Sequence, residues 1–308
     1  MVTASSSWRP PAFSGSGKRF RGNLHTHSTR SDGHATPAHV VEAYRRQGYD
    51  FIAVTDHFLE RYGYPITETR SWHSSEFTTV LGAELHVPAL ANGEIWHILA
   101  VGLPPDFEPP RPGETAPDLA ARAADAGAFV GLAHPAWYGL TPEEARSVEA
   151  AHAIEVYNET CAMHNDRGES WYLTDLLLSE GRRLTAFGAD DAHFFPERPD
   201  AFAVWVMVNA DRLDPPSLVD ALKAGAYYTS QGPLIHDVRI EGVELVIECS
   251  PVRSIFVSGR DRRVALVHGH RLTEWRCSLE PFLGSYCRLT VVDHAGRRAW
   301  SNPIWLEG

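Results

Sequence analysis

Imidazole and carboxylate side chains recur in this chain directly after short apolar runs. Two short motifs, His25-Thr26-His27 and Asp191-Ala192-His193, each contain two such side chains separated by one residue. Residues two apart on an extended backbone point the same way. Imidazole and carboxylate without thiolate suit Zn, Mn or Fe. A buried cluster of such groups needs a counter-cation, because burying unpaired charge is costly. The pattern therefore predicts divalent metal ions that ionise water for hydrolysis. Its members are His25, His27, Asp56, His57, Glu84, His134, Asp191 and His193.

Predicted β-strands position these polar groups. Apolar runs end at Leu24 and span 51–55, 79–83, 129–133 and 183–189, and each precedes one or two members of the set. In a βα barrel the carboxyl ends of the strands converge on one face, where active sites are built. We therefore expect the imidazoles and carboxylates to share one rim, although any single histidine would more often be structural.

Strand-like and helical stretches alternate from residue 20 to about residue 230. A helix is expected over 37–47, because Thr36 can cap its start and Gly48 follows its end. Repeated alternation predicts a parallel sheet, with about seven strand–helix units in this chain. The expected fold class is therefore α/β, a distorted (βα)7 TIM-like barrel over residues 20–232.

The two ends of the chain have a different texture. Residues 233–308 alternate apolar and polar side chains between glycine turns, which predicts a small antiparallel β module. That module could serve as an oligomer interface or only cover the flank of the barrel. Residues 1–19 begin with a stretch rich in Ser, Pro and Gly, and we expect a disordered lead-in without the features of a signal peptide.

Composition excludes several classes of protein. A net charge of −11 without a Lys/Arg-rich block argues against an extended nucleic-acid surface. No apolar run reaches the roughly 18 residues that a membrane helix needs. A small anionic substrate remains compatible, because bound cations invert the local field. The cysteines form no CxxC pair, so we expect reduced thiols and a cytoplasmic protein, with a Cys277–Cys287 bridge as the alternative. They are Cys161, Cys249, Cys277 and Cys287.

Several motifs together resemble a known family. The strings NLHTHSTRSDG, GYDFIAVTDH, GAE, AHP and DDAH occur in this order over residues 23–193, with a strand carrying His97 between the third and fourth. They resemble the PHP (polymerase and histidinol phosphatase) family. The resemblance implies a distorted seven-stranded barrel and a trinuclear metal centre. Downstream, ALKAGAYYTSQGP and AWSNPI are similar to the branch that contains carbaryl hydrolase.

The resemblance also implies a set of ligands. Glu84 would bridge two ions, and the first ion would also be held by His25, His27 and Asp191. His97 and His134 would complete the second site. The third ion would be held by Asp32, His57 and His193. Asp32 stands where many relatives have histidine, so we expect a harder and weaker third site.

Other residues near these motifs have alternative interpretations. Asp56 is expected to orient a metal-bound imidazole, and Asp190 to be either a proton carrier or a solvated carboxylate. Asn158 is either a substrate contact or a turn residue. Arg183 could clamp a phosphate, as could Arg167 or Arg182, but surface arginine is the simpler interpretation. His86 is expected to be a bystander that could substitute as a ligand.

Three hypotheses for function follow. The first is a phosphoesterase for a small phosphorylated substrate, in which a hydroxide bridging two metal ions attacks phosphorus. The second is a carbamate or carboxylic ester hydrolase that uses the same site. The third is a non-catalytic metal- or ligand-binding module. The ligand set favours the first hypothesis.

Overall fold

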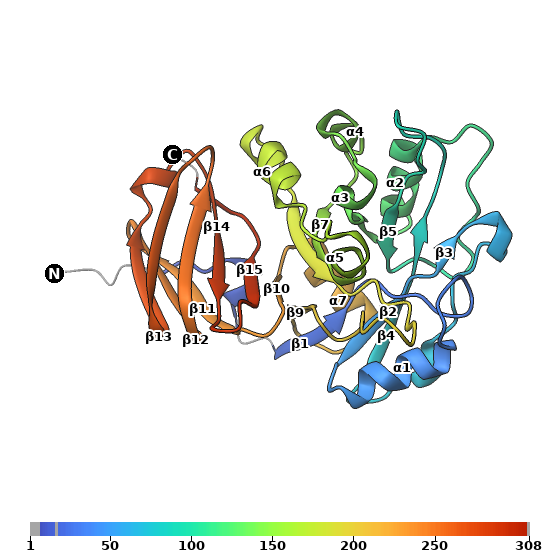
Figure 1. Cartoon of the computed structure of the whole chain (residues 1–308), viewed down its shortest axis with the longest axis horizontal. Helices are drawn as coiled ribbons and strands as arrows, with labels where there is room; N and C mark the ends of the chain where they lie inside the picture. The colour runs from blue at the N-terminus through green and yellow to red at the C-terminus, as the bar shows by residue number, and fades with distance from the viewer. Residues whose placement is uncertain (1–6, 16–17, 307–308) are drawn as a thin grey trace.

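The strands of the protein form one continuous sheet in the computed structural model, which describes residues 7–15 and 18–306. The strand order is β11-β12-β14-β15-β10-β9-β1-β2-β4-β5-β6-β7-β8 (Figure 1). In addition, β13 pairs with β12, β16 with β14, and β3 with β4. The strands are β1 (Lys18–Asn23), β2 (Phe51–Val54), β3 (His57–Phe58), β4 (Thr78–Leu85), β5 (Ile98–Val101), β6 (Phe129–Leu132), β7 (Ala153–Asn158), β8 (Thr185–Ala189), β9 (Trp205–Ala210), β10 (Tyr227–Ser230), β11 (Ile235–Glu241), β12 (Glu244–Gly259), β13 (Val264–Ser278), β14 (Ser285–Val292), β15 (Arg298–Ser301) and β16 (Ile304–Leu306).

Short helices connect the strands and cover the sheet. The helix expected over 37–47 is confirmed as α1, with the Thr36 hydroxyl accepting a hydrogen bond from the His39 N–H at its start. The α-helices are α1 (Pro37–Arg46), α2 (Ala116–Asp125), α3 (Pro135–Tyr138), α4 (Pro142–Ser147), α5 (Glu159–Asn165), α6 (Trp171–Ser179) and α7 (Pro215–Lys223). Single 3-10 turns lie at Pro11–Phe13, Glu60–Tyr62, Arg70–Trp72 and Glu280–Phe282.

The expected closed, all-parallel barrel is wrong in two respects. First, β1 pairs in parallel with β2 on one side and antiparallel with β9 on the other, so β8 has no free edge of β1 to pair with. Among the described residues, β-type pairing between the segments that follow β1 and β8 is limited to the isolated bridge Thr26–Ala192. Second, β5 is antiparallel to both β4 and β6. The segment 86–97 between β4 and β5 contains no helix, and a parallel crossover usually requires one.

An apolar cluster fills the inside of the curved sheet. Its side chains come from the strands β1, β2 and β4–β10, and from one face of α7. The cluster seals this interior from the side opposite the strand ends that carry the predicted ligands. Large buried members are Phe20, Phe51, Leu99, Phe129, Phe187, Val206 and Leu222.

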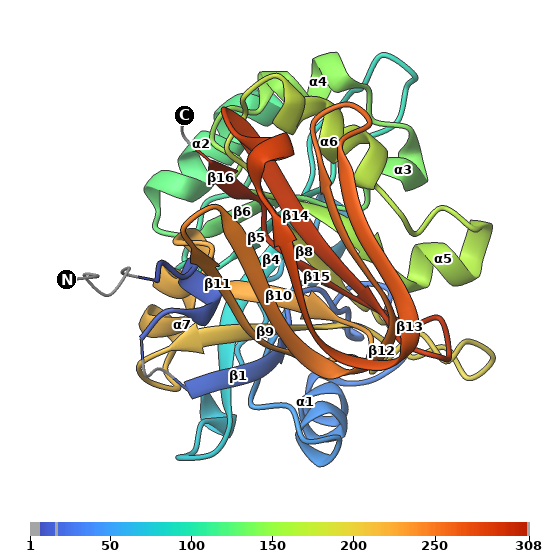
Figure 2. The ribbon, with the colours of Figure 1, turned by 90° about the vertical axis from the view of Figure 1, so that its left-hand side faces the viewer.

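The strands β11–β16 are antiparallel throughout and stand beside the rest of the molecule (Figures 1 and 2). They continue the same sheet, because β15 pairs with β10. The division of the chain at residue 232 remains a prediction.

Part of the expected disordered lead-in is ordered. Trp8 pairs with Ile240 of β11, and Arg9 lies 2.9 Å from Asp237. Ala12 and Phe13 are buried in the apolar core of the C-terminal strands. These apolar and basic residues are ordered because they contact the folded β module. The rest of the expected lead-in, at 1–6 and 16–17, lies outside the described residues.

No helix in the described part of the chain is both long and apolar enough to cross a membrane.

Candidate metal centre

The predicted ligands come from separate strand ends and meet at one edge of the sheet. His25 and His27 follow β1, His57 follows β2, and Glu84 lies near the end of β4. His134 follows β6, whereas Asp191 and His193 follow β8. His97 instead precedes β5. Because β5 is antiparallel to its neighbours, its first residue lies at the edge where the neighbouring strands end.

A first group of atoms surrounds one point. His25 Nε2 lies 3.6 Å from Glu84 Oε2 and 3.3 Å from Asp191 Oδ1. His27 Nε2 lies 3.6 Å and 2.8 Å from the same two oxygens. All four atoms are buried, and none of them makes a hydrogen bond of standard geometry among the described residues, although His57 Nδ1 also lies 2.6 Å from Glu84 Oε2. Atoms that bind one ion at about 2.0–2.2 Å stand roughly 3–3.5 Å apart, so this group fits a divalent cation.

A second group shares Glu84 with the first. Glu84 Oε1 lies 2.6 Å from His97 Nδ1 and 3.1 Å from His134 Nε2. The other oxygen of Glu84 faces the first group. One carboxylate can therefore contact two adjacent cations. The three side chains are buried and offer ligand atoms close enough for one ion.

A third group lies nearer the surface. His57 Nε2 and His193 Nε2 lie 3.3 and 3.5 Å from the two oxygens of Asp32. His27 joins this group through Nδ1, which lies 3.9 Å from Asp32 Oδ1. The structure thus brings all nine predicted ligands together in three overlapping groups, and their role in binding metal remains a prediction.

Charges inside the centre are strongly coupled. Burial opposes ionisation of Glu84, but the imidazoles of His57 and His97 outweigh it and hold the pKa of Glu84 well below its usual value. Burial also opposes protonation of His57, yet the carboxylates of Glu84 and Asp32 raise its pKa to about 10. Burial and the neighbouring His57 and His193 lower the pKa of His27 to about 4. The site therefore holds ionised carboxylates that attract positive charge, which metal ions can supply in place of protons.

Asp56 accepts hydrogen bonds from the loop that carries His27 and Asp32. Its carboxylate accepts hydrogen bonds from the Ser28 N–H and hydroxyl, both at 2.7 Å, and from the Ser31 hydroxyl at 2.8 Å. The Thr67 hydroxyl is a further donor. Asp56 is fully buried, so its contacts are those of a residue that positions the segment with His27 and Asp32.

Asp190 is also buried and engaged. One oxygen accepts hydrogen bonds from the Tyr44 hydroxyl at 2.7 Å and the Phe202 N–H at 2.8 Å. The other accepts from the Ala203 and Val204 N–H groups, both at 2.9 Å. Burial raises its pKa to about 7. Asp190 is fully buried, so it is not a solvated carboxylate, and a role as proton carrier remains a prediction.

The two predicted substrate contacts are placed differently. Asn158 caps α5 through its side-chain oxygen, and its Nδ2 donates to Asp191 Oδ2 and Glu155 Oε2, both at 3.1 Å. It is the cap of α5 rather than a turn residue, it contacts the predicted ligand Asp191, and a contact with substrate remains a prediction. Arg183 lies before β8, at the end of the strand opposite Asp191, with its guanidinium 5.0 Å from the centre of the Trp305 ring. The prediction that Arg183 binds substrate is therefore not supported, because the strand separates it from the site.

Sequence reasoning missed Glu155, which lies outside every recognised motif. Its Oε1 lies 3.2 Å from His25 Nδ1, and its Oε2 accepts a hydrogen bond from the His134 N–H at 2.7 Å. It is fully buried within β7. A glutamate in the otherwise apolar run AIEVY was the available signal. His86 was taken as a bystander, but its Nε2 lies 2.9 Å from His57 Nδ1 and 3.7 Å from Glu84 Oε2.

The ligand groups open into a cavity of about 380 Å³. Two arginines line it, Arg61 beside Tyr62 and Arg198 beside Phe195, and neither has an ion-pair partner among the described residues. Arg198 Nη1 also lies 3.4 Å from His164 Nδ1. The cavity lining thus includes two guanidinium groups that an anionic ligand could contact, beside the carboxylates of Asp32, Glu94 and Asp191.

Comparisons with known proteins support the fold. No family model matches the chain, and no curated protein matches it. Among solved structures, a two-domain protein from Bacteroides vulgatus ATCC 8482 that contains a predicted PHP-like metal-dependent phosphoesterase is similar over 95% of this chain and 96% of its own, with 17% identity and a TM-score of 0.55. This similarity shows that the two proteins share a fold over nearly their whole lengths.

Two other structures match a smaller share of the chain. One is described as a candidate metal-dependent phosphoesterase from Bifidobacterium adolescentis ATCC 15703, with 17% identity, a TM-score of 0.42, and coverage of 58% of this chain and 89% of that one. The other is an amidohydrolase from Chromobacterium violaceum with bound sulfate and no metal, with 16% identity, a TM-score of 0.39, and coverage of 56% and 87%. The chain is thus similar in fold to a protein with a PHP-like domain, and it carries a cluster of His, Asp and Glu side chains that could hold metal.

Proposed function

We propose that this protein is a metal-dependent phosphoesterase that acts on a small anionic substrate. The observation that carries the proposal is a set of buried atoms that make no hydrogen bond in the described part of the chain and that face one another across 2.8 to 3.6 Å, namely His25 Nε2, His27 Nε2, Glu84 Oε2 and Asp191 Oδ1. Buried polar atoms are seldom left unpaired in proteins, so this arrangement favours a cation that all four contact.

In the proposed site, each ligand group would hold a metal ion. The first and second groups would share Glu84, whereas the third would hold a further ion through Asp32, His57 and His193. Zn, Mn and Fe are the metals that this ligand set suits. When bound, such ions lower the pKa of a coordinated water and neutralise negative charge on a phosphate.

The surrounding side chains would select and orient the substrate. Arg61 and Arg198 line the cavity without carboxylate partners, so they are available to a phosphate oxygen. Trp137 and Phe195 line the same cavity and would exclude bulk water from it. These two guanidinium groups favour a phosphoester over a neutral carbamate or carboxylic ester. We also propose a cytoplasmic location, since all four cysteines are buried and free.

Metal content and activity test the proposal together. The wild-type chain, Glu84→Gln and His134→Ala would be analysed for bound Zn, Mn and Fe and assayed with p-nitrophenyl phosphate, an aryl ester and an aryl carbamate. We expect phosphate release by the wild type and a loss of at least about 100-fold in both variants, because each removes a predicted metal ligand of the two inner groups. His270→Ala, on the surface strand β13, is the matched control and should retain activity.

Two results would refute the proposal. One is undiminished turnover after the metal has been stripped with a chelator. The other is hydrolysis of the ester or carbamate with no release of phosphate, which would assign the same site to the alternative chemistry.

A further inference from the structure

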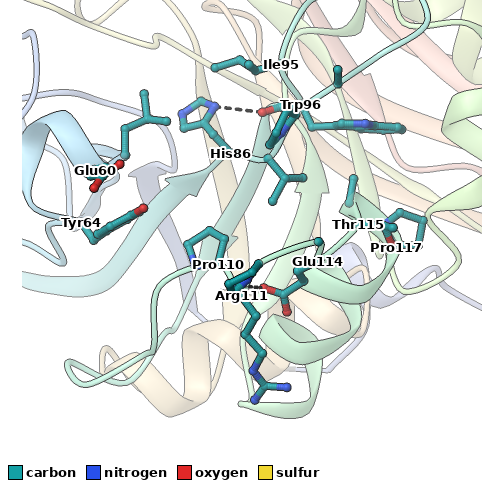
Figure 3. Close-up of a pocket in the computed structure, with 17 residues that line it drawn as sticks. Glu60, Tyr64, His86, Ile95, Trp96, Pro110, Arg111, Glu114, Thr115 and Pro117 are labelled. Atoms are coloured by element: carbon teal, nitrogen blue, oxygen red, sulfur yellow. Dashed lines mark hydrogen bonds between the residues drawn. The ribbon is translucent and has the colours of Figure 1, made fainter.

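A second cavity, of about 730 Å³, adjoins the cavity at the ligand groups. Its walls come from the segment after β3, the segment between β4 and β5, and the loop that leads into α2 (Figure 3). Leu59, His86 and Ile95 line both cavities. The two cavities are therefore neighbours that meet at these three side chains.

The second cavity is mainly apolar. Its charged members are turned away or already paired. Glu114 forms a salt bridge with Arg122 at 2.7 Å, and Arg111 extends away from the cavity (Figure 3). Glu60 is exposed at the rim. The wall thus offers contact surface for an uncharged group, through Leu59, Val87, Ile95, Trp96, Pro110 and Ala116.

His86 connects this apolar space to the proposed metal centre. Its Nδ1 lies 2.9 Å from the carbonyl oxygen of Trp96, which fixes the ring (Figure 3). Its Nε2 lies 2.9 Å from His57 Nδ1 and 3.7 Å from Glu84 Oε2. The second cavity therefore begins a single side chain away from the ligand groups. A substrate whose phosphate lies at the centre can place the group esterified to it past this ring.

The loop that closes the cavity is built to be rigid. Pro109, Pro110 and Pro112 fix their own backbone φ angles, and the loop ends at Thr115, which caps α2. Arg122 binds the carbonyl oxygens of Glu108 and Pro109 and so ties the loop to α2. A preformed apolar wall binds an apolar group with little loss of conformational entropy.

We propose that this cavity is the subsite for the apolar group of the substrate, so that the enzyme acts on phosphate esters of hydrophobic alcohols or phenols rather than of sugars. This inference rests on the proposed function. The volume lies within the range of about 300–1,000 Å³ found for small-molecule sites. The reaction is hydrolysis: water adds to phosphorus, the P–O bond to the alcohol breaks, and the alcohol leaves with a proton.

A pair of substrates tests the subsite. Phenyl phosphate and 4-tert-butylphenyl phosphate have similar leaving groups but differ in apolar bulk. We expect kcat/KM to be at least about 10-fold higher for the larger ester, since each buried methyl group adds to binding. Pro112→Trp, which places an indole at the cavity wall, should bring this ratio close to one. Pro105→Trp is the matched control, because Pro105 is exposed and does not line the cavity, and it should keep the wild-type ratio.

A binding measurement separates failure of the subsite from failure of the proposed function. Equilibrium dialysis with 4-tert-butylphenol should show binding to the wild type and Pro105→Trp and weaker binding to Pro112→Trp. Val87→Thr, which keeps the side-chain shape and adds a hydroxyl to the wall, is a second variant that should also weaken binding. Phosphatase activity with equal kcat/KM for both esters would overturn the subsite and leave the function standing. Absence of phosphoesterase activity would overturn the proposed function. Equal affinity for 4-tert-butylphenol in the wild type, Pro112→Trp and Val87→Thr would overturn the subsite.

Discussion

His25 contacts carboxylates through both nitrogens of its ring. Nε2 faces Glu84 and Asp191, whereas Nδ1 lies 3.2 Å from Glu155 Oε1. A carboxylate at Nδ1 favours the tautomer with its proton there, and this leaves the lone pair of Nε2 available to a metal ion. Glu155 is therefore expected to position a ligand without being one.

Replacing Glu155 tests this role. Glu155→Gln should weaken metal binding by about 10- to 100-fold, because the amide no longer enforces the tautomer of His25. Zinc and manganese affinities would be measured by competition with a chromophoric chelator, and circular dichroism would verify the fold. Glu159→Gln is the control, since Glu159 follows the same strand and bonds only the Tyr157 hydroxyl. Unchanged affinity in Glu155→Gln would show that Glu155 is merely a buried polar residue.

Asp190 has a structural role that can be measured separately from metal binding. It accepts hydrogen bonds from one hydroxyl and three backbone N–H groups. Asp190→Asn should lower the free energy of unfolding by about 1–3 kcal/mol, because an amide cannot accept all four bonds. Urea denaturation in the presence of a chelator measures this without a metal contribution. Asp211→Asn, at an exposed position, should have no effect, and an equal midpoint for both variants would contradict the interpretation.

Among the larger elements, the loop between β1 and α1 carries three of the predicted ligands. It is tightly folded, with the Ser31 and Gly33 N–H groups both donating to the Ser28 carbonyl oxygen at 3.0 Å. A Cβ atom at Gly33 would lie 2.7 Å from backbone atoms of His27 and Ser28. This position therefore requires glycine for the loop to place Asp32.

A methyl group added at residue 33 should displace the loop. Gly33→Ala should move Asp32 and reduce occupancy of the third group, with less effect on the two inner groups. Metal content per chain, measured by mass spectrometry after dialysis against limiting metal, tests this expectation. In Gly48→Ala the added Cβ meets no atom, and although its φ of 75° costs about 1 kcal/mol of stability, metal content should not change. Full occupancy in Gly33→Ala would show that the loop adapts.

At the scale of the whole molecule, the C-terminal strands stabilise the part that carries the site. Asn302 Oδ1 accepts a hydrogen bond from the Ala186 N–H, and its Nδ2 donates to the carbonyl oxygens of Gly225 and Tyr227. Arg288 forms a salt bridge with Asp175 of α6 at 2.7 Å. These contacts and the pairing of β15 with β10 indicate one cooperative unit.

Asn302→Ala should lower stability across the entire chain. It leaves buried backbone groups of β8 and β10 without partners, and the expected cost is about 2–5 kcal/mol in a single unfolding transition. Scanning calorimetry measures both the cost and the number of transitions. Asn165→Ala, at an exposed position on α5, is the control. Two separate transitions, with only one of them shifted, would show instead that the two parts unfold independently.

Much of the site could be predicted because its signals are local. His25-Thr26-His27 and Asp191-Ala192-His193 are short motifs directly after apolar strands, and the rule that strand ends converge was sufficient to bring them together. The same rule speaks against Arg183 as a substrate contact, because Arg183 stands at the start of the predicted strand 183–189 and not after its end. Glu155 was missed because an isolated acidic residue inside a strand resembles many surface positions.

The sequence by itself indicated the proposed chemistry of this protein, through the types of the predicted ligands and their positions after strands. Tertiary structure alone decided the direction of β5, the open edge between β8 and β1, and the apolar cavity next to His86. The physical reason is one of range. Side-chain type and strand periodicity are encoded in neighbouring residues, whereas strand pairing and cavity shape depend on contacts between segments far apart in the chain.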